Sequence, residues 1–164
     1  MDFTKQPIKT SVVACIIDEK ERVLLTRRCI PPFCGQWVMP GGKIDKGEAI
    51  LAALHREVLE EVGIGIRIDA LVDVFEHIGV GERNDHFIIL YYRAHPLSLD
   101  LAPNGEEVTE AIWVEHHRLP AFHLPPGTRH ILSKIFPDLG WGQGAPPVRH
   151  PEAELPGGQP LPQL

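Results

Sequence analysis

The chain of 164 residues lacks several features that would place it in a specialised class of protein. Its three cysteines, Cys15, Cys29 and Cys34, are odd in number and show no C-x-x-C spacing, which supports neither a disulfide framework nor a zinc site. No apolar run reaches membrane-spanning length, and the first residues, MDFTKQPIKT, hold no apolar signal-peptide segment. We therefore expect a cytoplasmic protein that does not enter a membrane.

The chain also lacks an excess of basic residues. It has 16 Lys and Arg against 22 Asp and Glu, which gives a net charge of −6. Without a broad basic surface it is not expected to bind a nucleic-acid polymer. A small anionic substrate would need a cation to bridge it to an acidic site. The chain is 43% hydrophobic and shows no internal repeat, which predicts a single domain over residues 1–139.

The composition shifts near the C-terminus. The last 24 residues hold six prolines and four glycines, with few large apolar side chains. Such a segment cannot bury enough apolar surface to offset the entropy lost on ordering. We expect residues 140–164 to form a disordered tail, or one that lies loosely on the surface. A proline-motif ligand for a partner protein is the alternative, and a homodimer with the tail docked across it is left open.

What the chain does contain is a group of carboxylates just after a glycine pair. Glu57, Glu60 and Glu61 stand at i, i+3 and i+4, and at about 100° per residue they share one stripe of a helix. Like charges at this spacing destabilise a helix, and a solvated face would usually interleave lysines. A divalent cation removes the conflict, and oxygen ligands suit Mg²⁺ best, with Mn²⁺ also acceptable. The stripe predicts half of a metal and phosphate site; an exposed acidic helix end is the alternative.

Apolar positions in the same segment predict the helix independently. They are Leu51, Leu54, Val58 and Val62. These side chains lie within about 80° of one another on a helical wheel, beside the glutamate stripe. Gly63 follows the run and can take the left-handed conformation that ends a helix. We expect a helix over about residues 47–62 that packs with one side and holds metal with the adjacent side.

Two charged residues near the stripe have alternative interpretations. Arg56 precedes Glu57 and lies four residues before Glu60, so its guanidinium can hold these carboxylates by a bidentate contact. A plain ion pair on the helix surface is the alternative. Glu48 would sit about 180° from Glu57 on an ideal helix. It joins the site only if the loop bends it inward; otherwise it is a favourable acid at a helix N-terminus.

The segment before the helix supplies further candidates. We expect residues 40–42 to form a turn, in which Gly41 and Gly42 provide either a positive φ or a close approach of the backbone to phosphate or metal. Lys43 follows and is a candidate substrate contact. Trp37 precedes the turn and can stack on a base, although packing in the core is the alternative.

Two segments outside the helix carry charges that can reach a substrate. Arg27 and Arg28 end a predicted strand, and adjacent strand residues point to opposite faces, so at most one faces the site. Arg27 is the candidate, and an ordinary solvated edge is the alternative. Glu106, Glu107 and Glu110 lie in or beside a polar loop, where an acid can bind a further metal or orient water. A solvated turn is the alternative there.

Periodicity and chain breakers predict the remaining elements. Strands are expected over residues 11–17, 22–28, 36–39, 64–77 (one strand or two), 87–94 and 111–114, and a second helix over 127–135. The second helix stops before Pro137. This order predicts a mixed sheet between helices.

Residues 42–64 resemble the sequence motif of the Nudix hydrolase family. The motif runs Gly, five residues, Glu, seven residues, Arg-Glu, an aliphatic residue, any residue, Glu-Glu, any residue, Gly and an aliphatic residue. The matching positions are Gly42, Glu48, Arg56, Glu57, Val58, Glu60, Glu61, Gly63 and Ile64. The resemblance implies an α/β fold, a Nudix-type α/β/α sandwich with a mixed β-sheet, over roughly residues 8–136.

The resemblance also implies an activity and roles for the site residues. The activity is magnesium-dependent hydrolysis of a nucleoside diphosphate linked to another moiety, by water attacking phosphorus. The metal ligands would be Glu57, Glu60 and Glu61 with a backbone carbonyl of the Gly42 region. Glu107 matches best the glutamate of a downstream loop that often binds a further metal or activates water. The partner would be a small nucleotide or nucleotide derivative.

The resemblance leaves the substrate open. Residues 37–45, WVMPGGKID, look closest to the MutT-like nucleoside triphosphate pyrophosphohydrolases, which favours nucleoside triphosphates. Residues 78–81 lack the proline common in ADP-ribose hydrolases of the family and the tyrosine common in its dinucleoside polyphosphate hydrolases. The alternatives are an ADP-ribose or sugar-nucleotide diphosphatase, and a non-catalytic nucleotide-binding regulator on the same fold. The complete set of carboxylates favours an enzyme.

Overall fold

The computed structural model describes residues 6–31, 34–79 and 85–141. In chain order the elements are β1 (Lys9–Ile16), β2 (Arg22–Arg28), β3 (Trp37–Val38), β4 (Gly41–Lys43), α1 (Ile50–Val62), β5 (Ile66–Ile78), β6 (His86–Pro96), β7 (Val108–Glu115), the 3-10 helix η2 (His116–Ala121) and α2 (Pro126–Ile135). Most predicted elements are confirmed to within a few residues at their ends.

The strands divide into two sheets. The first has the order β4-β1-β6-β5, in which β1 pairs parallel with β6 and antiparallel with β4, so this sheet is mixed. The second has the order β3-β2-β7 and is antiparallel throughout. The chain passes from the second sheet to the first at Met39 and Pro40, and the carbonyl of Pro40 accepts a hydrogen bond of 2.9 Å from the Ala14 N–H. This crossing brings the glycine pair against β1.

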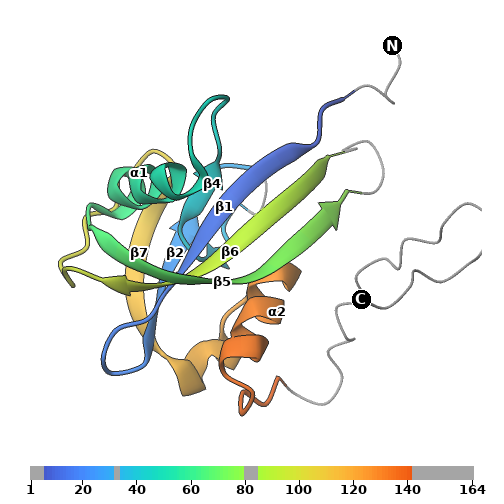
Figure 1. Cartoon of the computed structure of the whole chain (residues 1–164). Coiled ribbons are helices and arrows are strands. Elements are labelled where there is room, and N and C mark those ends of the chain that lie inside the picture. The colour runs from blue at the N-terminus through green and yellow to red at the C-terminus, as the bar shows by residue number, and fades with distance from the viewer. Residues whose placement is uncertain (1–5, 32–33, 80–84, 142–164) are drawn as a thin grey trace, which may run out of the picture.

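The sheets lie between the two α-helices, which Figure 1 shows on opposite sides of the strands. The core on the α1 side includes Val12, Leu24, Leu54, Val58 and Val62. The core on the α2 side includes Leu25, Phe75, Tyr91, Ile131 and Leu132. Leu24 and Leu25 enter different cores because adjacent residues of a strand point to opposite faces. The predicted α/β/α sandwich with a mixed sheet is confirmed.

Two details of the first helix and the long strand differ from the prediction. The helix expected from about residue 47 begins only at Ile50, because Gly47 has a left-handed φ of 83°. Leu51 therefore lies in the first helical turn and is 45% exposed, although the apolar stripe predicted its burial. The segment expected as one strand or two is a single strand, β5, which keeps its pairing with β6 through two register shifts.

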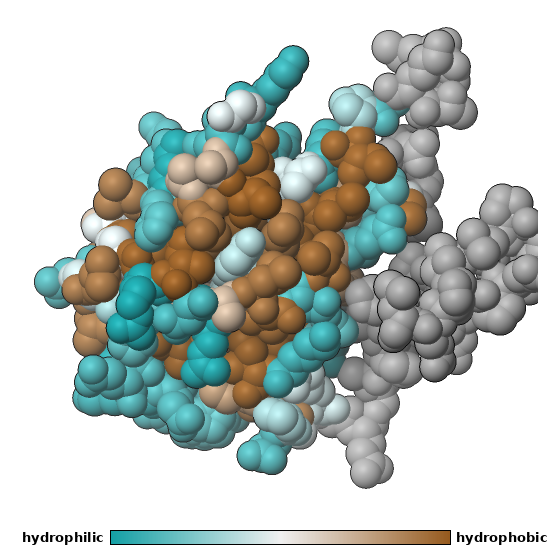
Figure 2. Space-filling model, in the orientation of Figure 1, coloured by the Kyte–Doolittle hydropathy of each residue, from teal (hydrophilic) through white to brown (hydrophobic). Residues whose placement is uncertain are grey.

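Part of the mixed sheet presents apolar side chains to solvent. Leu71, Val74 and Ile78 are exposed on β5, the edge strand. Figure 2 shows hydrophobic residues gathered over the sheet on the face turned to the viewer. Exposed apolar patches often mark interaction surfaces. This patch is compatible with the expected homodimer, which stays a prediction. No helix in the described ranges is both long and apolar enough to cross a membrane.

The chain after α2 folds back onto the α2-side core. Leu139 is 9% exposed in this core, and Trp141 packs against it. The Arg129 guanidinium lies 5.2 Å from the centroid of the Trp141 ring. The predicted tail began at residue 140, but Trp141 packs against the core. Residues 142–164 fall outside the described residues, so for them the disordered tail stays a prediction.

Candidate active site

Three carboxylates from two segments meet beside α1. Glu57 and Glu61 project from successive turns of α1 and are only 8% and 3% exposed. Glu107 comes from the loop before β7 and is half-buried. The three side chains can each present an oxygen within 4.8 Å of those of the other two. Because closely spaced carboxylate oxygens are the donors that hard divalent cations prefer, the group fits such a cation.

Glu60 lies on the solvent side of the same helix. Its side chain is 55% exposed, and its carboxylate accepts a hydrogen bond of 3.2 Å from Arg56 Nη1. Glu60 and Glu61 are neighbours in sequence and hence about 100° apart around the helix axis. The structure thus groups Glu57 and Glu61 with Glu107, whereas the sequence grouped them with Glu60. The assignment of Glu60 as a metal ligand stays a prediction.

The electrostatic balance of the group is unfavourable without a cation. Burial raises the pKa of Glu61 to about 8, although the Gly41 N–H donates a hydrogen bond of 3.2 Å to its Oε2. The neighbouring charges of Glu57 and Glu107 raise the pKa of Glu61 further. Burial also raises the pKa of Glu57, although Arg56 lies against it. An external cation would relieve both groups.

The glycine pair is part of a strand and not the turn that we expected. Gly41 and Gly42 lie in β4 and pair with Val13 and Val12 of β1. Neither has a positive φ. They are required for close approach: a Cβ at Gly41 would collide with the Val12 carbonyl oxygen, and a Cβ at Gly42 would collide with the Glu57 carboxylate. Of the two interpretations left open by the sequence, the positive φ is wrong. The close approach seen here is to Val12 and Glu57, so approach to phosphate or metal, and the Gly42 carbonyl as a metal ligand, stay predictions.

Arg56 connects the helix to the segment that precedes it. Its Nε and Nη2 donate to the two carboxylate oxygens of Glu48, at 2.7 and 2.8 Å. Its Nη1 donates to Glu57 at 2.9 Å as well as to Glu60, and Nη2 also reaches the Lys43 carbonyl at 3.3 Å. Hydrogen bonding from Arg56 lowers the pKa of Glu48 to about 2. Arg56 therefore holds strand, loop and helix together, which is more than a plain surface ion pair.

The two arginines at the end of β2 differ in their surroundings. Arg27 Nη1 donates to Glu110 Oε2 at 3.1 Å across the strand pair, and both side chains are about half exposed. The charge of Arg28, in contrast, acts on Glu61 and lowers its pKa. Sequence alternation predicted that at most one of the pair faces the site, and Arg27 was the candidate. Arg27 as a substrate contact stays a prediction, and Arg28 is a residue that the sequence did not select.

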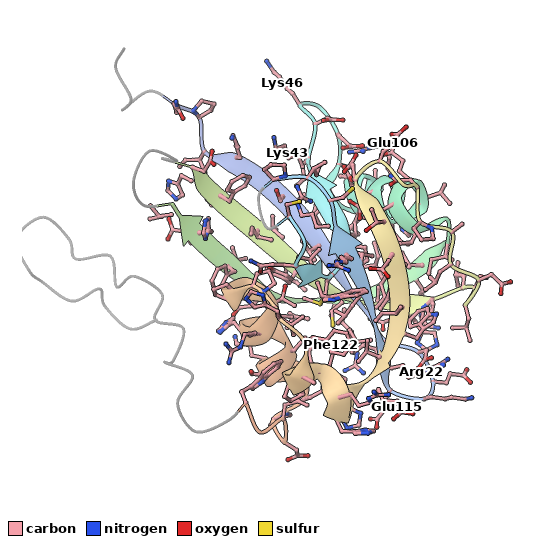
Figure 3. The ribbon with its side chains drawn as sticks, turned by 180° about the vertical axis from the view of Figure 1, so that it is seen from behind. Arg22, Lys43, Lys46, Glu106, Glu115 and Phe122 are labelled. Atoms are coloured by element: carbon pink, nitrogen blue, oxygen red, sulfur yellow. The ribbon has the colours of Figure 1, made fainter. Side chains whose placement is uncertain are left out.

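The remaining candidates differ in their burial. Trp37 is partly buried and packs edge-on against Phe122, with ring centroids 5.7 Å apart. The Lys43 side chain is exposed, and Figure 3 shows it at the same end of the molecule as Glu106. Glu106 is exposed, so in this loop Glu107 alone belongs to the carboxylate group. Substrate contacts of Trp37 and Lys43 stay predictions.

Two surface pockets in the described part of the chain lie elsewhere. One of about 240 Å³ is lined by residues that include Asp18, Arg22, His95 and Leu97. The other, of about 150 Å³, is lined by residues that include Phe122, Arg129 and Trp141. Neither is lined by a member of the carboxylate group. We assign the candidate active site to the carboxylates, because buried carboxylates with a raised pKa indicate a functional site more strongly than the volume of a pocket does.

Comparisons with known proteins agree with this geometry. A sequence profile of the NUDIX domain matches residues 7–139. The 8-oxo-dGTP diphosphatase of Haemophilus influenzae is 31% identical over 127 residues, which cover 76% of this chain and 90% of that protein. The ADP-ribose pyrophosphatase of Methanocaldococcus jannaschii is 29% identical over 105 residues, with 64% and 61% covered. The crystal structure of a MutT NUDIX hydrolase from Burkholderia pseudomallei matches with a TM-score of 0.72 and 29% identity, over 79% of this chain and 99% of that one.

Proposed function

The chain belongs to the Nudix hydrolase family, and from this premise we propose that it is a magnesium-dependent pyrophosphohydrolase that prefers nucleoside triphosphates. The coarser activity is that of the family: the protein is a hydrolase that acts on the pyrophosphate bonds of nucleotides. The observation that carries the proposal is the close group formed by Glu57, Glu61 and Glu107.

The carboxylate group fits a divalent cation. Glu57, Glu61 and Glu107 are the side chains that we propose as ligands, and Glu60 and the Gly42 carbonyl remain further candidates. All of these donors are oxygen atoms, which favours Mg²⁺ and admits Mn²⁺. When bound, such a cation neutralises charge on diphosphate oxygens and lowers the pKa of a bound water.

The protein's own groups would position and deprotonate the attacking water. Glu107 comes from a loop and is less buried than Glu57 and Glu61, so it is our candidate for accepting a proton from water. The water oxygen bonds to phosphorus and the anhydride P–O bond breaks, which yields a nucleoside monophosphate and pyrophosphate from a triphosphate. No covalent enzyme intermediate is needed. Arg56 keeps Glu57 and Glu48 oriented through the bonds described above.

The positive side chains around the site would bind the phosphate chain. Arg28 already acts electrostatically on Glu61, while Arg27 lies on the same strand, β2, and Lys43 lies on β4. Trp37 precedes the glycine pair along the chain and is our candidate for contact with the base.

The choice of substrate rests on sequence likeness. One relative is named for 8-oxo-dGTP and another for ADP-ribose. Residues 37–45 resemble the MutT-like group, and we therefore place nucleoside triphosphates first, with oxidised dGTP among them. ADP-ribose and sugar nucleotides are the second candidate class.

The test is chromatographic measurement of the nucleoside monophosphate released from a panel of compounds, since cleavage of the diphosphate yields this product from every class. The panel contains nucleoside triphosphates, 8-oxo-dGTP, ADP-ribose, dinucleotides and sugar nucleotides, each with magnesium and with chelator. We expect magnesium-dependent turnover that is fastest with a triphosphate. Fastest turnover of ADP-ribose would transfer the assignment to the second class. Binding of nucleotide without turnover of any compound would identify a regulator.

A further inference from the structure

The loop that carries Glu107 is attached to the end of α1. The Ala102 N–H donates to the Val62 carbonyl at 2.9 Å, and the Asn104 N–H donates to the Glu61 carbonyl at 3.0 Å. Carbonyls in the last turn of a helix have no partner within the helix. The loop supplies these partners, and in doing so it places Asn104 against the backbone of the residue that bears the most buried carboxylate of the site.

The side chain of Asn104 organises the loop beyond this point. Its Oδ1 accepts hydrogen bonds from three successive amides, those of Glu106, Glu107 and Val108, at 3.0, 3.1 and 3.3 Å. Gly105 makes the tight turn possible with a φ of 76°, and its N–H donates to the Val108 carbonyl at 2.9 Å. A single oxygen therefore fixes the backbone on both sides of Glu107.

The other side of the loop is tied to β2. The Cys29 N–H donates to the Glu107 carbonyl at 3.0 Å, and the Cys29 thiol donates to the Glu106 carbonyl at 2.9 Å. These bonds continue the pairing of β2 with β7. They hold the peptide of Glu107 to the second sheet but not to α1. The loop is bonded to α1 by the backbone of Ala102 and Asn104, and of these two residues it is Asn104 whose side chain also accepts from the Glu107 amide.

Glu107 needs such a link because its neighbours repel it. Its carboxylate can present an oxygen within 4.8 Å of those of Glu57 and Glu61, and like charges this close repel one another. A loop that was free to move would carry Glu107 away from the two helix carboxylates. We propose that Asn104 is a positioning residue, which holds Glu107 against Glu57 and Glu61 so that the three carboxylates form one cation site. This inference rests on the proposed function of Glu107.

The experiment measures Mn²⁺ affinity of the substrate-free protein by calorimetry, and kcat and KM with the best substrate of the panel. The variants are Asn104→Ala, Asn104→Asp, Glu107→Gln and the double variant Asn104→Ala/Glu107→Gln. Loss of a group that orients a metal ligand typically costs about 10- to 100-fold in metal affinity or activity. We expect Asn104→Ala to lower Mn²⁺ affinity and kcat by about this factor, with KM changed little. Asn104→Asp keeps the acceptor oxygen and should stay within about threefold of wild type.

The double variant separates positioning from general stability. If Asn104 acts through Glu107, the double variant should be no weaker than Glu107→Gln alone. The matched control is Asp18→Ala, because Asp18 Oδ1 accepts from the amides of Lys20 and Arg22 in the turn between β1 and β2. Figure 3 shows Arg22 and Glu106 at opposite ends of the molecule. We expect this control to lower the unfolding temperature and to leave Mn²⁺ affinity unchanged.

Three outcomes would overturn the inference. They are wild-type Mn²⁺ affinity in Asn104→Ala, additive losses in the double variant, and an equal loss of affinity in Asp18→Ala. Wild-type affinity and kcat in Glu107→Gln would also overturn it, since Asn104 would then have no functional carboxylate to position. If the wild-type protein bound Mn²⁺ but hydrolysed no nucleotide, the proposed function would fail, and the affinity measurements would still decide the role of Asn104.

Discussion

Two acidic centres, one beside each α-helix, differ in how far neighbouring groups compensate their negative charge. Asp73 on β5 accepts hydrogen bonds from His130 Nε2 at 2.9 Å and Lys134 Nζ at 2.6 Å, both from α2. Burial alone would raise the pKa of Asp73, but these bonds lower it to about 2. Glu61 on α1 has mainly like charges around it, and burial raises its pKa to about 8.

The difference separates a structural acid from a functional one. At Asp73 the fold supplies the Lys134 ammonium and a hydrogen bond from His130, so the ionised carboxylate stabilises the contact between β5 and α2. At Glu61 the fold supplies two further carboxylates, opposed by the Gly41 N–H and the charge of Arg28, and burial and the like charges prevail. We expect such an arrangement to cost stability in the apo protein and to become favourable when a cation binds. The two centres therefore respond in opposite directions to the same neutralising substitution.

The largest expected effect concerns Glu107, the third carboxylate of the group that it forms with Glu57 and Glu61. Glu107→Gln should lower kcat on the order of 10² to 10⁴ while changing substrate affinity far less, because a general base acts mainly in the transition state. Glu106→Gln and Glu110→Gln should have much smaller effects, since Glu106 is exposed and Glu110 pairs with Arg27. Steady-state kinetics of the three variants provide the measurement. If all three stay within a few-fold of wild type, Glu48 or a helix glutamate becomes the leading candidate for the base.

The next effect compares the two centres directly. Glu61→Gln should lower turnover at least about 10-fold at limiting magnesium, yet leave the apo unfolding temperature unchanged or raised, because repulsion is relieved. Asp73→Asn should leave turnover unchanged and lower the free energy of unfolding by roughly 1–2 kcal/mol. Turnover and apo unfolding should be measured on the same preparations.

A third variant in this series tests Glu60, the predicted metal ligand whose side chain lies on the solvent side of α1. The sequence predicts that Glu60→Gln also lowers turnover greatly while the fold stays intact. Near-wild-type activity of Glu60→Gln at low magnesium would remove Glu60 from the ligand set.

The pH dependence of apo stability sharpens the same contrast. The pKa of Glu61 is raised from 4.5 to about 8 in the folded protein. Between pH 4.5 and about 8 the folded state therefore holds a proton on Glu61 that the unfolded state has lost. The contribution of this proton to the free energy of unfolding is fully present below pH 4.5 and is lost as pH rises through about 8. The pKa of Asp73 is lowered from 3.8 to about 2, so its contribution is present above pH 3.8 and lost as pH falls through about 2.

Urea unfolding in the presence of chelator measures this dependence. The wild-type protein should lose stability between about pH 5 and pH 8, and Glu61→Gln should flatten that slope. Asp73→Asn should leave the slope in this range unchanged. An equal slope in wild type and Glu61→Gln would contradict the assignment of the proton to Glu61.

The smallest effect concerns the chain after α2, of which Leu139 and Trp141 pack on the side of the compensated centre. A chain that ends after Trp141 should hydrolyse nucleotides and unfold like the full chain, because residues 142–164 hold few large apolar side chains. A chain that ends after Leu139 also loses the contact between Trp141 and Arg129 and should melt only a few degrees lower. A fall of several degrees on the first truncation would show that the tail is docked.

The sequence by itself determined the fold class and most of the chemistry. Fixed gaps between Gly42, Arg56 and Glu57 carried the family resemblance, and apolar periodicity placed α1 because a helix repeats every 3.6 residues. The same periodicity placed Glu57 and Glu61 on one side of the helix. Local patterns of this kind depend on neighbours within a few residues, which is why they can be read without coordinates.

Only the tertiary structure decided which charges meet. Glu107 joins the site through a loop that is 46 residues beyond Glu61 in the chain, and its closeness depends on the hydrogen bonds of Asn104 and Cys29. Glu60 belongs to the motif but lies outside the carboxylate group, because burial of α1 against the sheets selects one side of the helix. Long-range packing sets the depth and the neighbours of each carboxylate, and these set its pKa.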